Sequence, residues 1–139
     1  MIPGTGPGAT LSRFPFLSTA HWLVVLRVVL GCYMCAHGVT RTVVGTVDDF
    51  GGFLAGQGVP AGAVVAWVIT LNEIVGGLAL ASGRLVRWFA AVFALEHVVG
   101  IILVHAPRGW FTVGYQSGGA EYSVLLILCF LTTASAARS

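Results

Sequence analysis

The sequence contains no lysine and carries little charge of either sign. Only 9% of the 139 residues are charged, and seven arginines against five acidic residues give a net charge of +2. A soluble domain of this length carries about a quarter charged residues, so the composition excludes an ordinary water-soluble fold. The small net charge also provides no basic surface for nucleic acid, and we expect no nucleic-acid partner.

Recognisable ligand and cofactor signatures are also missing. The chain has no His-Glu-x-x-His spacing, and we predict no metal site from sequence motifs. It has no signature for haem, flavin or nucleotide either. The cofactor is therefore unknown from sequence, and any electron carrier would be a quinone, an unrecognised metal or the cofactor of a partner.

Long apolar segments are what the sequence does contain. The chain is 57% hydrophobic with a mean hydropathy of +0.92. A helix needs roughly 17–25 residues to cross the hydrocarbon core, and the apolar runs are continuous where barrel strands would alternate. We therefore predict an all-α integral membrane bundle of four transmembrane helices. The four expected helices cover about residues 22–44, 62–82, 85–105 and 120–137.

The flanking residues predict the domain organisation and the orientation. Residues 1–20 lack the charged region and cleavage site of a signal peptide, so we expect an N-terminal cytoplasmic tail followed by one membrane domain, residues 21–139. With four spans, both termini and the turn at 82–87 share one side of the membrane. That side carries four arginines: Arg13, Arg84, Arg87 and Arg138. The positive-inside rule places it in the cytoplasm, with the bundle in the cell (inner) membrane.

The two segments that connect the expected helices on the opposite side of the membrane are predicted to form a short helix and a folded loop. In "DDFGGFLAGQGVP", residues 48–60, the apolar residues Phe50, Phe53 and Leu54 fall at helical spacing. This pattern predicts a short interfacial helix on the outer membrane surface. The glycine- and aromatic-rich segment "APRGWFTVGYQSGG", residues 106–119, is expected to fold back over the bundle as a lid.

Polar residues inside the apolar runs are costly in a membrane and are therefore candidates for function. Counting depth at about 1.5 Å per residue separates them into two layers. The middle layer contains Arg27, Glu73, Glu96 and His97. The outer layer contains His37, Arg41, His105 and Glu121.

The middle layer has a structural and a functional interpretation. Arg27 is long enough to reach Glu73, and a lone buried charge would be destabilising, so we predict an ion pair between them that fixes helix packing. A proton relay or a headgroup site is the alternative. Glu96 and His97 are sequence neighbours that point about 100° apart, so one of them is expected to face another partner or a ligand.

The outer layer brings two histidines and a carboxylate from three expected helices to a similar depth. Such a set can hold iron or zinc. It can also donate hydrogen bonds to a quinone or another small polar substrate and exchange its protons. A hydrogen-bonded polar plug without ligand explains the same residues equally well, and the sequence leaves these alternatives open.

The pair Cys32 and Cys35 forms a Cys-x-x-Cys spacing inside the first expected helix. Reactive pairs need accessible thiolates, and desolvation in hydrocarbon disfavours the thiolate. We interpret both residues as small buried hydrophobes, with a redox role as the weaker alternative.

Several motifs in order give the chain a family resemblance. The segments "LRVVLGCYMCAHGVTR", "FLAGQGVP", "NEIVGGLALASGRLVR" and "VHAPRGWF…GGAEYSVLLIL" resemble the DoxX family of small four-helix membrane proteins. The matching positions are Arg27, Gly31, His37, Gly38, Arg41, Gly58, Pro60, Glu73, Gly76, Gly77, Gly83, His105 and Glu121. The cysteines and Glu96–His97 are not part of the resemblance.

The resemblance implies a membrane subunit associated with redox or respiratory chemistry, because relatives include the small subunit of a thiosulfate:quinone oxidoreductase. A quinone-linked oxidoreductase is then the expected function. The alternatives are a non-catalytic accessory subunit that stabilises a larger membrane complex, and a small transporter or proton pathway. The expected partners are the lipid bilayer and other membrane subunits, or further copies of the chain.

The predicted topology can be tested by labelling single cysteines in a background without the three native ones. Gly118→Cys should react with a membrane-impermeant maleimide in intact cells, and Ser139→Cys should react only after permeabilisation. Labelling of position 139 from outside intact cells would show that the termini are not cytoplasmic.

Overall fold

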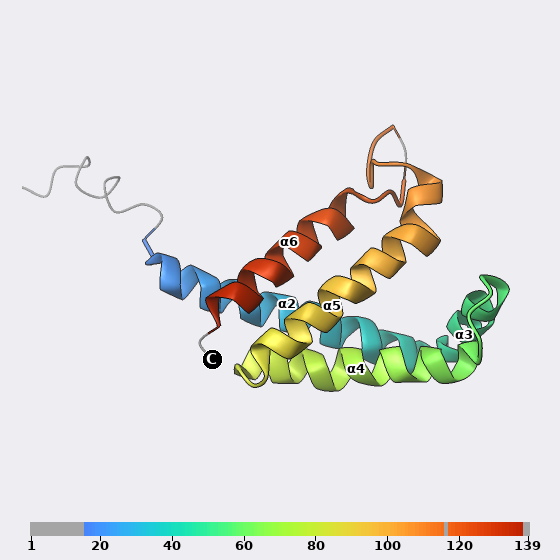
Figure 1. Ribbon diagram of the computed structural model, residues 1–139, viewed down its shortest axis with the longest axis horizontal. Coiled ribbons are helices and arrows are strands. Elements are labelled where there is room, and N and C mark those ends of the chain that lie inside the picture. The colour runs from blue at the N-terminus through green and yellow to red at the C-terminus, as the bar shows by residue number, and fades with distance from the viewer. Residues whose placement is uncertain (1–15, 116, 138–139) are drawn as a thin grey trace, which may run out of the picture.

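The computed structural model describes residues 16–115 and 117–137, and every regular element in these ranges is helical (Figure 1). The elements are α2 (Thr19–Val44), α3 (Val47–Gly56), α4 (Gly62–Ser82), α5 (Val86–Gly100), the π-helical η1 (Ile101–His105), the 3-10 helix η2 (Ala106–Arg108) and α6 (Glu121–Ala136). The all-α class predicted from the continuous apolar runs is confirmed. Residues 1–15 of the expected tail, with Arg13, and Arg138 at the other end lie outside the described residues.

In the described part of the chain, three helices are long and apolar enough to cross a membrane. They are Thr19–Val44, Gly62–Ser82 and the continuous stretch Val86–Arg108. The apolar helix α6 has 16 residues and measures roughly 24 Å at 1.5 Å per residue. Because that is just below the usual spanning length, its crossing of the membrane stays a prediction.

The long helices form two antiparallel hairpins. Helix α2 packs mainly against α4, and α5 packs mainly against α6. The hairpins meet where α2 begins, α4 turns into α5 and α6 ends, which we call the terminal end (Figure 1). They diverge toward α3 and the 106–120 loop, which we call the loop end.

Glycines bring the backbones of α2 and α4 into close contact. A Cβ added to Gly31 would lie 2.5 Å from the Gly77 carbonyl oxygen, and one added to Gly77 would lie 2.6 Å from the Gly31 carbonyl oxygen. Nearer the loop end, a Cβ on Gly38 would lie 2.7 Å from the Thr70 carbonyl oxygen. Small residues at transmembrane contacts allow this approach, and here they fix how far each helix slides along the other.

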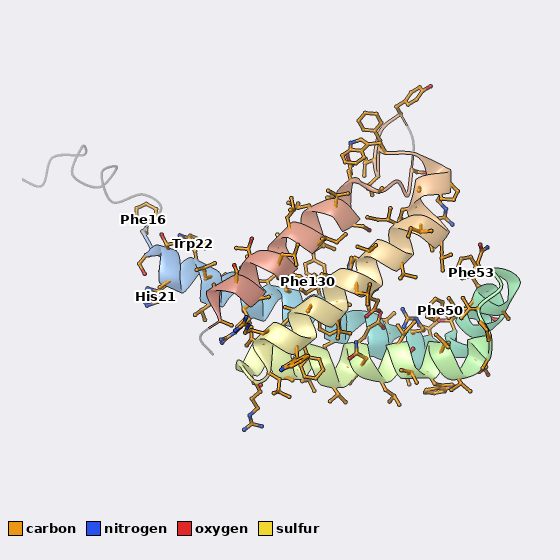
Figure 2. The ribbon with its side chains drawn as sticks, in the orientation of Figure 1. Phe16, His21, Trp22, Phe50, Phe53 and Phe130 are labelled. Atoms are coloured by element: carbon orange, nitrogen blue, oxygen red, sulfur yellow. The ribbon has the colours of Figure 1, made fainter. Side chains whose placement is uncertain are left out.

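Two apolar clusters hold the remaining elements. The larger one includes Phe130 of α6, labelled in Figure 2. The ring centroids of Phe130 and Phe93 of α5 are 5.5 Å apart. The smaller one joins α3 to α4 through Val47, Leu54 and Ala66. The predicted short helix at 48–60 is therefore present as α3, with its buried face against α4.

The 106–120 loop closes on itself. Backbone N–H groups of Gly119 and Glu121 donate to the carbonyls of Phe111 and Trp110, at 3.1 and 3.0 Å. In Figure 1 the loop continues beyond the ends of α5 and α6 and does not extend over α2 or α4. The described residues of the loop therefore do not fold back over the bundle as the predicted lid, because the loop's own backbone pairing holds it at the end of the α5–α6 hairpin.

A matched pair of glycine variants tests the close contact between α2 and α4. Gly77→Ala should destabilise the fold by about 1–3 kcal/mol, because the new methyl group collides with backbone atoms of α2. Gly100→Ala is the control, since a Cβ there meets nothing within 4 Å and should leave stability unchanged or slightly raised. Thermal unfolding and monodispersity in mild detergent are the measurements. Equal stability of the two variants would contradict the packing.

Candidate functional site

An ion pair between α2 and α4 lies at the centre of the site. Arg41 Nη1 donates to Glu73 Oε2 at 2.6 Å, and Nη2 donates to Oε1 at 3.2 Å. Nη1 also donates to Thr70 Oγ1 at 3.0 Å, and the Thr70 hydroxyl donates to the Ala66 carbonyl at 2.7 Å. The side chains of Arg41 and Glu73 are 18% and 5% exposed, so this two-pronged pair is held largely out of solvent.

Helix α3 covers the guanidinium of Arg41. The Arg41 Cζ lies 4.5 Å from the centroid of the Phe50 ring, within the range of a cation–π contact. In Figure 2 the labelled Phe50 points from α3 toward the α2–α4 pair. One arginine therefore connects three helices.

Glu96 brings the second hairpin to this ion pair. Its side chain projects from α5 within hydrogen-bonding reach of Glu73 and Asn72 on α4, where the charge of Arg41 also acts on it. Two carboxyl groups can hydrogen-bond to each other only when one of them carries a proton. Arg41 pairs with Glu73, so a proton shared between the two carboxyl groups would reside on Glu96.

His97 follows Glu96 in α5 and points to a different side of the helix. Its Nδ1 donates to the Phe93 carbonyl at 2.8 Å, and its ring lies 5.4 Å from that of Phe130. Because a carbonyl only accepts, the proton of the neutral imidazole is on Nδ1 and Nε2 is left as an acceptor. His97 is close enough for electrostatic interaction with Glu73, His37 and His105.

The predicted outer layer does not assemble as one unit. His105 Nδ1 donates to the Gly118 carbonyl at 2.8 Å, and Glu121 Oε1 accepts from the Thr112 backbone N–H at 2.9 Å. Both side chains thus organise the 106–120 loop, while His37 is exposed on α2. Across residues 16–115 and 117–137, no group of three or more His, Cys, Asp or Glu is arranged to hold a metal ion.

The predicted pairing of Arg27 with Glu73 is wrong. Side chains on a helix lean toward its N-terminus. Arg41, near the end of α2, therefore reaches back to Glu73, whereas Arg27 reaches away from it to the terminal end. There a Cβ on Gly83 would lie 2.9 Å from Arg27 Nη1. The glycine contacts agree, because they place Gly38 beside Glu73.

Sequence reasoning overlooked three members of the site. Thr70 lies three residues before Glu73 on the same face of α4, a spacing that could have revealed it. Asn72 and Phe50 gave no such signal, because their roles depend on where α5 and α3 pack.

Cys32 and Cys35, three residues apart in α2, differ in burial. Cys32 is exposed, whereas Cys35 is half-buried and packs against Gly77, where an added Cβ would lie 3.1 Å from the Cys35 Cβ. Both are free thiols. Their interpretation as small hydrophobes stays a prediction.

Comparison with known proteins identifies relatives of the chain. The family model described as DoxX matches residues 22–106, which cover α2 to η1 and hence Arg41, Glu73, Glu96 and His97. A Bacillus subtilis (strain 168) protein described as "Putative oxidoreductase CatD" is 30% identical over 107 residues, or 76% of this chain and 71% of that protein. No solved structure matches.

Removing one partner of the ion pair tests its importance for the fold. Glu73→Gln should destabilise the protein by about 3 kcal/mol, because it leaves the Arg41 guanidinium buried without a counter-charge. Thr70→Val removes both hydrogen bonds of the Thr70 hydroxyl, to Arg41 and to Ala66, and should cost about 1–2 kcal/mol. Asp49→Asn, the same chemical change at an exposed position of α3, is the control. Unfolding temperatures in detergent that do not differ between Glu73→Gln and Asp49→Asn would contradict a structural role of the pair.

Proposed function

The chain belongs to the DoxX family of membrane proteins, and from this we propose that it is the membrane subunit of a quinone-linked oxidoreductase. The observation that carries the proposal is the contact of Glu96 with Glu73. In this proposal a proton shared by these carboxyl groups is exchanged with the substrate, and the imidazole of His97, the next residue of α5, offers Nε2 as an acceptor. The printed description of the Bacillus subtilis relative as an oxidoreductase supports the reaction class.

Reduction of a quinone to a quinol consumes two electrons and two protons. In the proposed reaction, a redox cofactor in a partner subunit supplies the electrons. Glu96 donates a hydrogen bond to one quinone oxygen and then transfers its proton to it. Reprotonation of Glu96 from the aqueous side restores the site, and a further proton taken up from solvent completes the quinol.

Arg41 and Glu73 have a positioning role in this scheme. The two-pronged ion pair fixes the Glu73 carboxylate, and this carboxylate and Asn72 together fix Glu96. A purely structural pair would need only Arg41 and Glu73. The additional carboxyl group is costly in a membrane, and proton exchange gives it a purpose.

The bilayer is the expected route of the substrate. His37 is exposed on α2 and interacts electrostatically with His97 on α5. A lipid-soluble quinone moving within the membrane would meet His37 before it reaches His97 and Glu96. This route requires no water-filled channel.

Binding of a short-chain quinone tests the proposal. We expect the wild-type protein in nanodiscs to bind decylubiquinone, measured as ligand-dependent thermal stabilisation. Glu96→Leu and His97→Phe should each bind roughly tenfold more weakly, because each loses one hydrogen-bonding group. Glu121→Gln is the matched control, because its amide oxygen can still accept from Thr112 and it lies outside the Glu73–Glu96 contact.

Wild-type protein that does not bind decylubiquinone would reject the quinone role. Unchanged affinity in both Glu96→Leu and His97→Phe would place any bound quinone elsewhere. If those two variants also co-purify with the same membrane proteins as the wild type, the accessory role becomes the better explanation.

A further inference from the structure

Two adjoining cavities flank Arg27 at the terminal end, away from the Glu73–Glu96 contact. The first has a volume of about 230 Å³ and lies between α2, α5 and α6. The second has about 350 Å³ and lies beside the α4–α5 turn. Arg27, Val86 and Ala137 line both.

The first cavity contains two buried polar groups without a partner. Within residues 16–115 and 117–137, Arg27 Nε and Thr133 Oγ1 are buried side-chain atoms that make no hydrogen bond. Thr133 itself is 3% exposed, and both residues line the cavity. Leaving such groups unsatisfied costs free energy, most of all for a charged guanidinium. The pair is therefore suited to a ligand with negatively charged oxygen atoms.

No acidic side chain of this chain is placed to supply those oxygens. The sequence has five: Asp48, Asp49, Glu73, Glu96 and Glu121. The two aspartates are on α3, Glu73 pairs with Arg41, Glu96 contacts Glu73, and Glu121 binds the loop. Arg84 and Arg87 add further positive charge at the terminal end. A counter-charge for Arg27 must come from outside these side chains.

We propose that this cavity binds the phosphate of an anionic phospholipid. The phosphate oxygens accept hydrogen bonds from Arg27 Nε and the Thr133 hydroxyl, and an acyl chain lies against Leu23 and Val24 of α2. Basic pockets between transmembrane helices bind anionic headgroups in this way. Charge-assisted hydrogen bonds from arginine to phosphate are among the stronger ones.

The position of Arg27 favours a lipid over a free anion. Arg27 lies eight residues after Thr19, the start of α2, or roughly 12 Å along the helix. Its side chain extends back toward the membrane surface, as long basic side chains near helix ends do. Trp88 lines the second cavity and is exposed, as is usual at headgroup level. This lipid site needs none of the residues proposed to handle quinone.

Native mass spectrometry of the full chain in mild detergent can count bound lipids. We expect the wild type to bind dioleoyl-phosphatidylglycerol about tenfold more tightly than dioleoyl-phosphatidylcholine. Arg27→Gln should remove this preference, and Thr133→Val should reduce it several-fold. The control for Arg27→Gln is Arg84→Gln, which removes the same charge at the terminal end. The control for Thr133→Val is Thr132→Val at the neighbouring position, where the Thr132 hydroxyl already donates to the Leu128 carbonyl.

Several results would overturn the lipid site. One is equal affinity of the wild type for the two lipids. Another is an equal loss of the phosphatidylglycerol preference in Arg27→Gln and Arg84→Gln, which would mean that unspecific surface charge causes the preference. If Arg27→Gln does not fold, Thr133→Val becomes the deciding variant. The site is rejected if Thr133→Val prefers phosphatidylglycerol over phosphatidylcholine as strongly as Thr132→Val does. Inorganic phosphate is tested separately by thermal shift. If millimolar phosphate stabilises the protein as much as phosphatidylglycerol does, and this effect is lost in Arg27→Gln, the ligand of the cavity is a soluble anion instead of a lipid.

Discussion

The ion pair of Arg41 with Glu73 is the interaction on which the site depends. It joins α2 to α4 near the middle of the bundle, and Phe50 brings α3 onto it. Its geometry requires the close backbone approach that Gly31, Gly38 and Gly77 allow. A buried pair of this kind is weak support for stability by itself, because desolvation offsets much of the attraction. What it provides is a fixed carboxylate against which α5 can place Glu96.

The sequence singled out polar residues that the fold brings together, but it did not indicate how they pair. Composition and continuous apolar runs were sufficient for the all-α membrane class, since so little charge cannot cover a soluble surface. Arg41, Glu73, Glu96 and His97 stood out because polar groups are rare in apolar helices. The pairing of Arg27 was wrong because depth counting ignores the lean of side chains along a helix. His105 and Glu121 bind a loop whose closure depends on backbone contacts that no motif indicates.

The acidic side chains of the described residues are confined to the middle and the loop end of the bundle. The carboxylates lie in the middle and at the loop end, where Arg41 and backbone N–H groups compensate Glu73 and Glu121. The terminal end carries arginines and no acidic side chain in the described residues. Arg27 can lack an acidic side chain as its partner because the bilayer supplies counter-charges of its own.

The divergence of the two hairpins toward the loop end gives the Glu73–Glu96 contact a mechanical meaning. This contact links the α2–α4 hairpin to the α5–α6 hairpin, and two carboxyl groups attract each other only while one of them carries a proton. Loss of that proton would place two carboxylates in contact, with Arg41 paired to one of them, and would weaken the link between the hairpins. By thermodynamic linkage, any change in the angle between the hairpins must then alter how tightly the proton is held, and the proton must alter the angle in return. The protonation state of the Glu73–Glu96 contact and the angle between the two hairpins are therefore coupled.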